Sequence, residues 1–312
     1  MKGLDLSEKY FFEFGLKMLQ EKFPNYLNHI SAGLIGEGSE CYGFDDEISR
    51  DHDWGPGFCI WLTPEDYNII GEDLQKEYDR LPKEFMGYHA RVTTPLSGQR
   101  VGVFETNSFF KQFTGLDHVP RELSEWQRIP EEYLAQATNG KVFLDSLGIV
   151  SGIRDSLVAY YPDDIRLKKI AARCMTAGQS GQYNFLRSLR RKEYVAAHHA
   201  LSKFIQDSIS TIFLLNRRYK PFYKWMHRGL MDLSVLGPSV YFMYEFLVIS
   251  DIKIDGSREI YNTIEKISAL IIEKIKEMGL SRLKSNFLCD HGPDIQNKIR
   301  DSYLRSLHVM AG

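Results

Sequence analysis

Apolar and polar positions follow different periods in the two halves of the chain. In the first half, short apolar runs bounded by turn residues predict strands at residues 31–36, 52–62, 100–105 and 141–144. Apolar positions at helical spacing predict a helix over 5–23 that Pro24 ends. A second helix is predicted over 63–78, opened by Thr63 as the N-cap before Pro64.

From about residue 163 the helical period dominates. It predicts helices at residues 163–189, 191–215, 221–233, 257–278 and 293–308. Strands gathered in one half and helices in the other are typical of an α+β domain followed by a helical one. The predicted fold class is therefore α+β, with a mixed sheet and its helices in residues 1–155 and an all-helical domain in residues 156–312.

Composition excludes several classes of protein. The 312 residues are 43% hydrophobic and 26% charged with a formal net charge of −2, which is ordinary for a globular protein. The near-neutral charge disfavours nucleic-acid binding and gives no general attraction to a membrane surface. The most apolar window, residues 240–249, is interrupted by Glu245 and is too short to span a bilayer. We expect a soluble, cytoplasmic protein without a membrane partner.

The cysteines favour neither a zinc site nor a disulfide framework. They lie far apart and form no CxxC pair: Cys41, Cys59, Cys174 and Cys289. Candidate chemistry therefore has to come from other residue types.

The stretch GSECYGFDDEISRDHDWGPGFCIWL, residues 38–62, concentrates carboxylates before an apolar run. On an extended strand Asp51 and Asp53 would point to the same face, roughly 6.5 to 7 Å apart at their Cα atoms. Two carboxylates this close repel unless one is protonated or a cation bridges them, and Mg²⁺ prefers such oxygen ligands. Upstream, Gly38 and Ser39 form a flexible turn whose amides are suited to phosphate oxygens.

The neighbouring residues of this loop are expected to have structural roles. Asp45, Asp46 and Glu47 are expected to cap or hydrogen-bond the loop, and His52 to pack behind the acidic pair. A solvated loop with an incidental Asp-x-Asp is the alternative interpretation of the whole stretch.

A glycine-serine turn after a strand, then eleven residues, then Asp-x-Asp resembles the signature of the polymerase-beta-type nucleotidyltransferase superfamily. The resemblance implies that Gly38 and Ser39 hold a triphosphate and that Asp51 and Asp53 bind metal, with two Mg²⁺ ions expected. The string GSECYGFDDEISRDHDWGP and the later LNRRYKPFYKW, residues 215–225, are similar to a bacterial nucleotidyltransferase-like family with a helical C-terminal domain.

The superfamily also implies a third carboxylate on a later strand, which acts as a metal ligand and as the base. Glu105 is the one acid of the predicted strand RVGVFET. It is either that third ligand or a surface acid at the end of the strand. In the second case the base comes from the helical domain, or the protein binds nucleotide without transferring it.

The basic stretch FLLNRRYKPFYKWMHR, residues 213–228, carries cations without any acid. Arg217 and Lys224 are candidate ligands of the nucleotide phosphates. The same pattern also suits core aromatics beside basic residues at the end of a helix. Separately, Arg191 and His198 lie seven apart, a spacing similar to that of a helical ribonuclease family; an ordinary helix surface is the alternative.

The sequence thus predicts a Mg²⁺-dependent nucleotidyltransferase. The resemblance implies transfer of a nucleotidyl group, with adenylyl preferred, from ATP or another NTP to a hydroxyl or phosphate of a small-molecule acceptor. A non-catalytic nucleotide-binding or regulatory protein of the same fold is the alternative, followed by a ribonuclease in the helical domain. The sequence gives no indication of the oligomeric state.

Overall fold

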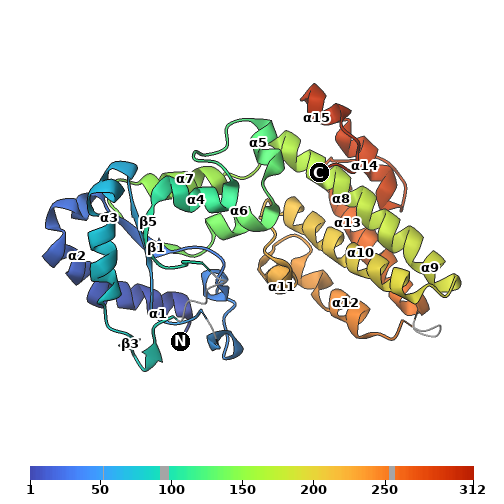
Figure 1. The fold of residues 1–312 in the computed structure, drawn as a ribbon. Helices are drawn as coiled ribbons and strands as arrows, with labels where there is room; N and C mark the ends of the chain where they lie inside the picture. The colour runs from blue at the N-terminus through green and yellow to red at the C-terminus, as the bar shows by residue number, and fades with distance from the viewer. Residues whose placement is uncertain (52, 92–97, 253–256) are drawn as a thin grey trace. The chain divides into compact units, whose positions relative to one another are not determined.

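The chain forms two compact units (Figure 1) in a computed structural model that describes residues 1–51, 53–91, 98–252 and 257–312. Unit 1 comprises Met1–Arg121 and Tyr133–Ala159, and unit 2 comprises Glu122–Glu132 and Tyr160–Gly312. We expected one boundary after residue 155. The chain instead enters unit 2 for one short segment, returns to unit 1, and leaves it after Ala159.

Unit 1 is built on a four-stranded sheet in the order β5-β2-β1-β6. β2 and β5 are parallel, whereas the β1–β2 and β1–β6 pairs are antiparallel. The strands of unit 1 are β1 Ser31–Leu34, β2 Cys59–Leu62, β3 Glu84–Phe85, β4 Tyr88–His89, β5 Gly102–Glu105 and β6 Lys141–Asp145. Its helices are α1 Gly3–Tyr10, α2 Leu16–Lys22, α3 Pro64–Asp79, α4 Thr106–Thr114, α6 Glu131–Thr138 (the first two residues in unit 2) and α7 Ile149–Val158.

Local sequence explains the start of α3 and the apolar character of β2. The Thr63 hydroxyl accepts a hydrogen bond from the Asp66 N–H at 3.2 Å, and Pro64 occupies the first turn, as predicted. Every residue of β2 is buried because both faces of the sheet are covered.

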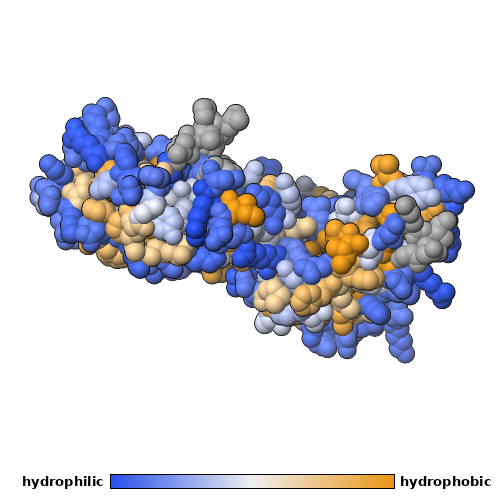
Figure 2. Space-filling model, turned by 90° about the horizontal axis from the view of Figure 1, so that it is seen from below, coloured by the Kyte–Doolittle hydropathy of each residue, from blue (hydrophilic) through white to orange (hydrophobic). Residues whose placement is uncertain are grey.

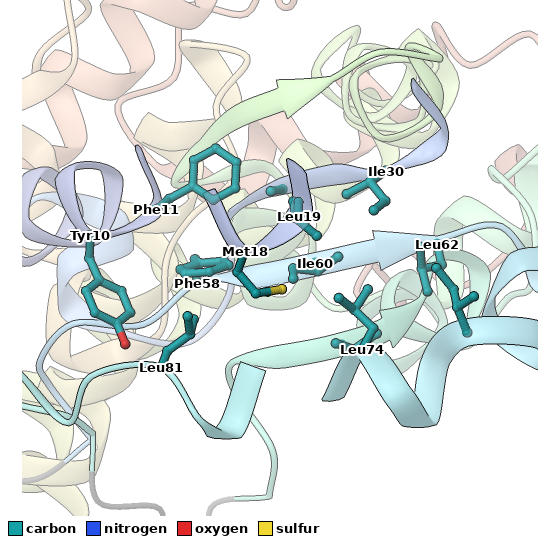
Figure 3. Packing of buried hydrophobic residues seen from close by; sticks show 13 residues of the cluster. Tyr10, Phe11, Met18, Leu19, Ile30, Phe58, Ile60, Leu62, Leu74 and Leu81 are labelled. Atoms are coloured by element: carbon teal, nitrogen blue, oxygen red, sulfur yellow. The ribbon is translucent and has the colours of Figure 1, made fainter. Parts of the chain in front are cut away.

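Aromatic and aliphatic side chains cover each face of β2. On one face Ile60 and Leu62 join a core with residues of the N-terminal helices, seen in Figure 3. There the Phe11 and Phe58 rings pack edge to face with centroids 5.2 Å apart. On the other face the Trp61 ring contacts Phe109 of α4 at 5.2 Å. This packing fixes the ends of β1 and β2, from which the candidate site is built.

Unit 2 is helical. Its helices are α5 Leu123–Arg128, α8 Asp163–Ala177, α9 Leu186–Arg190, α10 Tyr194–Leu215, α11 Tyr223–Met226, α12 Gly237–Ile249, α13 Ser257–Glu277, α14 Leu288–Gln296 and α15 Ser302–Ser306. A π-helical segment, Gly178–Phe185, joins α8 to α9, and α8 lies beside α10 and α14 (Figure 1). The α+β fold class is confirmed.

The helix α12 was not predicted from the sequence. It is mostly apolar, with Glu245 as its one charged residue, and Phe242, Val248 and Ile249 remain exposed. In the space-filling view of Figure 2, patches of hydrophobic residues lie on a surface that is otherwise largely hydrophilic. Among the residues described, every helix is too short or too polar to cross a membrane.

Candidate functional site

The glycine-serine turn follows β1 and is held from behind. Gly36 has a φ of 133°, a conformation that glycine adopts without strain. The Asn139 side chain accepts from the Gly36 N–H at 2.9 Å and donates to the Gly36 carbonyl at 2.6 Å. The turn therefore has a fixed position relative to β1.

The turn presents donors at Ser39. Gly38 leads into a short 3₁₀ turn, Ser39–Tyr42, and neither the Ser39 N–H nor its hydroxyl has an acceptor within the described part of the chain. A Cβ at position 38 would lie 2.3 Å from the carboxylate of Glu40, which is buried. Glycine at this position leaves Glu40 in place and the Ser39 donors accessible to a phosphate oxygen.

Arg91 joins this turn to the loop that carries Asp53. Its guanidinium contacts the Glu40 carboxylate at 2.5 Å, and both side chains are almost fully buried. The same side chain donates to the backbone carbonyls of Asp53 and Gly55, each at 3.1 Å. Because Glu40 belongs to the 3₁₀ turn, this pairing keeps Asp53 close to the glycine-serine turn.

A second arginine, Arg100, also connects the turn to Asp53, in this case through carboxylate side chains. Arg100 Nη1 lies 3.5 Å from Asp53 Oδ2, and Arg100 Nη2 lies 3.2 Å from Glu37 Oε2. Glu37 belongs to the turn itself, so one guanidinium bridges the turn and the aspartate. Sequence reasoning missed Arg91 and Arg100 because it searched this region for acids.

The predicted strand over 52–62 is too long. β2 begins only at Cys59, and Asp51 and Asp53 lie in the loop before it. Asp51 ends a 3₁₀ turn and is exposed, whereas Asp53 is buried with a φ of 51°. The argument that both aspartates share one face of an extended strand is therefore wrong. His52 lies outside the described residues.

Two of the three acids upstream of Asp51, namely Asp45 and Asp46, have the structural roles that were expected. Asp45 Oδ2 accepts hydrogen bonds from the Gly3 N–H at 2.8 Å and from Trp54 Nε1 at 3.1 Å. Asp46 Oδ1 accepts from the Ser49 N–H at 3.0 Å. The predicted loop hydrogen bonds are therefore confirmed for Asp45 and Asp46.

Glu105 caps a helix. It ends β5, and its two carboxylate oxygens accept from the Asn107 and Ser108 N–H groups, each at 2.7 Å. This is the strand-end alternative, with both oxygens occupied by the first turn of α4. In residues 1–51, 53–91, 98–252 and 257–312, no three His, Cys, Asp or Glu side chains converge to hold a metal ion.

These contacts decide which metal arrangement fits. A site of two metals held by three carboxylates does not fit, because Glu105 is engaged in its cap. Mg²⁺ commonly takes one or two carboxylates and completes its shell with water and phosphate oxygens, and binding of one such ion by Asp51 and Asp53 stays a prediction.

The other predicted residues lie in unit 2. Arg217 is exposed and forms an ion pair with Asp163 at 2.7 Å. Lys224 is exposed, with its ammonium 5.7 Å from the centroid of the Trp225 ring. A role for Arg217 or Lys224 in nucleotide binding stays a prediction.

The helix that was expected to carry the ribonuclease pair is broken. α9 ends at Arg190 and α10 starts at Tyr194, with Lys192 at a φ of 61° between them. Arg191 and His198 therefore do not share one helix, and His198 is exposed. The spacing argument for a ribonuclease is wrong.

Comparisons with known proteins give two likenesses. Residues 126–226 match the model of a family described as "Domain of unknown function (DUF4037)". A crystal structure of a nucleotidyltransferase-like protein from Exiguobacterium sibiricum overlays on 85% of this chain and 77% of that chain, with 13% sequence identity and a TM-score of 0.36. An overlay of this quality does not establish a shared fold. A search of curated proteins finds no significant match.

Proposed function

We propose that this chain is a nucleotidyltransferase that binds a nucleoside triphosphate on unit 1. It transfers a nucleotidyl group, adenylyl from ATP by preference, to a hydroxyl or phosphate of a small-molecule acceptor. The observation that carries the proposal is the bridge from Glu37 of the glycine-serine turn through Arg100 to Asp53. It supports the proposal because it connects the turn that carries the Ser39 donors to the carboxylate of Asp53.

Each residue of the turn and the loop has a proposed role. The Ser39 N–H and hydroxyl donate to phosphate oxygens, and Gly38 keeps that approach open. Arg100 offsets the charge of the triphosphate with a planar pair of donors. Asp51 and Asp53 hold Mg²⁺, which supplies charge neutralisation at the phosphates when bound.

A second candidate is nucleotide binding without transfer. It is favoured by Glu105, whose carboxylate is engaged by α4 and does not serve as the third acid of the superfamily pattern. Both candidates require the same phosphate-binding turn. They differ only in whether pyrophosphate is released.

The test compares two aspartates of one loop. Asp53→Asn keeps the backbone conformation, because asparagine tolerates a positive φ well, but it removes the charge that binds metal. Asp46→Asn is the matched control, since Asp46 is exposed and bonded to Ser49. We would measure calorimetric binding of a non-hydrolysable ATP analogue with Mg²⁺, and pyrophosphate release from ATP with a pool of small acceptors.

We expect the wild type and Asp46→Asn to bind the analogue and release pyrophosphate. Asp53→Asn should bind at least about tenfold more weakly, a loss of about 1.4 kcal/mol, and should lose release by orders of magnitude. Binding by the wild type without release from any acceptor would select the second candidate. No binding by the wild type would refute both.

A further inference from the structure

Unit 2 contains a charged cavity that the proposed function does not use. Its volume is about 320 Å³, which is at the lower end for sites of small molecules. Four cationic and three acidic residues line it. The residues that carry the argument are Glu131, Lys169, Arg173, Asp207, Ser210 and Lys220.

The two buried acids of the cavity are already paired. Glu131 accepts from the Ser210 hydroxyl at 2.7 Å and from Arg173 at 3.5 Å. Asp207 pairs with Lys203, whose ammonium lies 3.0 Å from its carboxylate. Residues of α8 and α10 thus form ion pairs with both carboxylates, and the two lysines of the cavity remain to be accounted for.

Lys169 and Lys220 are buried but have no acid partner. They are 5% and 7% exposed, and no carboxylate of the described residues lies within ion-pair distance of either ammonium. The Lys169 ammonium lies 5.2 Å from the centroid of the Tyr161 ring. Lys220 donates only a long bond, 3.4 Å, to the carbonyl of Pro221.

Burying an ammonium without a counter-ion costs free energy because the charge loses its hydration. The pKa of Lys169 reflects that cost. Burial lowers the pKa of Lys169, and the Glu131 carboxylate opposes that change only in part. Two such groups facing one cavity form a place where an incoming anion gains more than it would at the surface.

We propose that this cavity binds the oxyanion of a small molecule, a phosphate ester or a carboxylate, through Lys169 and Lys220. Arg173 lies beside them and adds a third cation. The volume restricts the ligand to the size of a small metabolite. The site lies wholly within unit 2, so it stands whether or not unit 1 transfers nucleotides.

The test uses the full chain and inorganic phosphate, with acetate as a second probe. Lys169→Met and Lys220→Met keep the length of the stem and remove the charge. Lys284→Met, at an exposed position of the same unit, is the matched control. Calorimetry measures binding, and thermal unfolding without any probe measures stability.

We expect each cavity variant to bind at least one probe about tenfold more weakly than the wild type and the Lys284→Met control. The probe bound more tightly by the wild type identifies the ligand as a phosphate ester or a carboxylate. The proposed function also places a phosphate on the glycine-serine turn of unit 1, so the part of binding that depends on Lys169 is the readout.

Stability separates binding from a purely structural role. Without probe, Lys169→Met should melt close to the wild-type temperature, because the burial cost of the ammonium is removed together with its partial attraction to Glu131. A large fall in its melting temperature would overturn the proposal. So would wild-type affinity for both probes in the two cavity variants, or the absence of any binding to the wild type.

Discussion

Buried charge is treated differently in the two units. At the candidate site of unit 1 the buried Glu40 is paired with the buried Arg91, and Asp53 lies beside Arg100. In the cavity of unit 2 the buried acids Glu131 and Asp207 are paired, but Lys169 and Lys220 have no ion-pair partner among the described residues. A buried pair holds two segments together without needing a ligand, whereas an unpaired buried cation favours an anion from outside.

The comparison also separates two kinds of arginine within unit 1. Arg91 is 5% exposed at its side chain and bonds to two backbone carbonyls, which makes it part of the architecture. Arg100 is 30% exposed and makes longer contacts to two carboxylates. An arginine of the second kind can exchange a carboxylate for a phosphate, which is why nucleotide binding by Arg100 is part of our proposal.

The largest effect is expected at the buried pair. Arg91→Ala leaves the Glu40 carboxylate buried and uncompensated, so it should lower the free energy of unfolding by roughly 3 to 5 kcal/mol. Urea denaturation followed by tryptophan fluorescence measures the change. The exposed ion pair of Lys76 with Glu72 is the control, and Lys76→Ala should have no measurable effect.

The double variant Arg91→Ala with Glu40→Ala sharpens this result. Removing both charges should destabilise less than the sum of the two single changes, because neither partner then remains buried alone. Additive losses would show that the two side chains do not act as a pair.

A smaller effect is expected for Arg100, on nucleotide affinity and not on stability. Arg100→Gln removes the charge but retains hydrogen-bonding groups, so affinity for the ATP analogue should fall about tenfold, or about 1.4 kcal/mol. Calorimetry measures the affinity, and the urea midpoint should change far less than for Arg91→Ala. Unchanged affinity would remove Arg100 from the phosphate site and place it with Arg91 as a structural residue.

Glu105 gives the next test. Glu105→Ala removes the cap of α4 and should lower stability by about 1 kcal/mol, whereas Glu105→Gln keeps an acceptor and should lower it less. If the transferase is active, Glu105→Gln should release pyrophosphate at the wild-type rate within about twofold. A loss of orders of magnitude with stability retained would restore Glu105 as the third carboxylate.

The smallest effect is a dependence on pH in unit 2. Burial pushes the pKa of Glu131 upward, but Arg173 and Lys169 together with the Ser210 hydroxyl outweigh it and hold the pKa below its usual range. A lowered pKa gives stability that is complete above the ordinary value of about 4.3 and is lost as the pH falls through the lowered one.

The comparison of wild type with Glu131→Gln tests this sign. The wild type should be the more stable near neutral pH, and its advantage should shrink between about pH 5 and pH 3. Urea midpoints at several pH values measure the difference. A difference that stays constant on acidification would mean that the charge of Glu131 does not stabilise unit 2.

Local signals in the sequence predicted the elements that depend on local physics. The Thr63–Pro64 start of α3 and the long periodic helix α13 needed only capping and hydrophobic spacing. The strand over 52–62 was predicted too long because the apolar character of the run outweighed Gly55, Pro56 and Gly57, which favour a turn.

The charges of both sites depend on residues far apart in the chain. Arg91 meets Glu40 across 51 residues, and Ser210 meets Glu131 across 79. Neither pairing leaves a periodic or motif signal. The glycine-serine turn and the pair Asp51 and Asp53 were predicted together because the superfamily resemblance connects them. The helix α12 was missed because its nearly all-apolar sequence lacks the periodic polar face of an amphipathic helix.

The central claim is that Asp51 and Asp53 bind a divalent cation beside a phosphate on the Ser39 turn. Diffraction from crystals grown with Mn²⁺ and a non-hydrolysable ATP analogue tests it directly, because manganese is located by its anomalous signal. The account predicts manganese coordinated by these carboxylates, with phosphate oxygens accepting from Ser39. Manganese and phosphates bound elsewhere, with Asp53 still paired with Arg100, would contradict it.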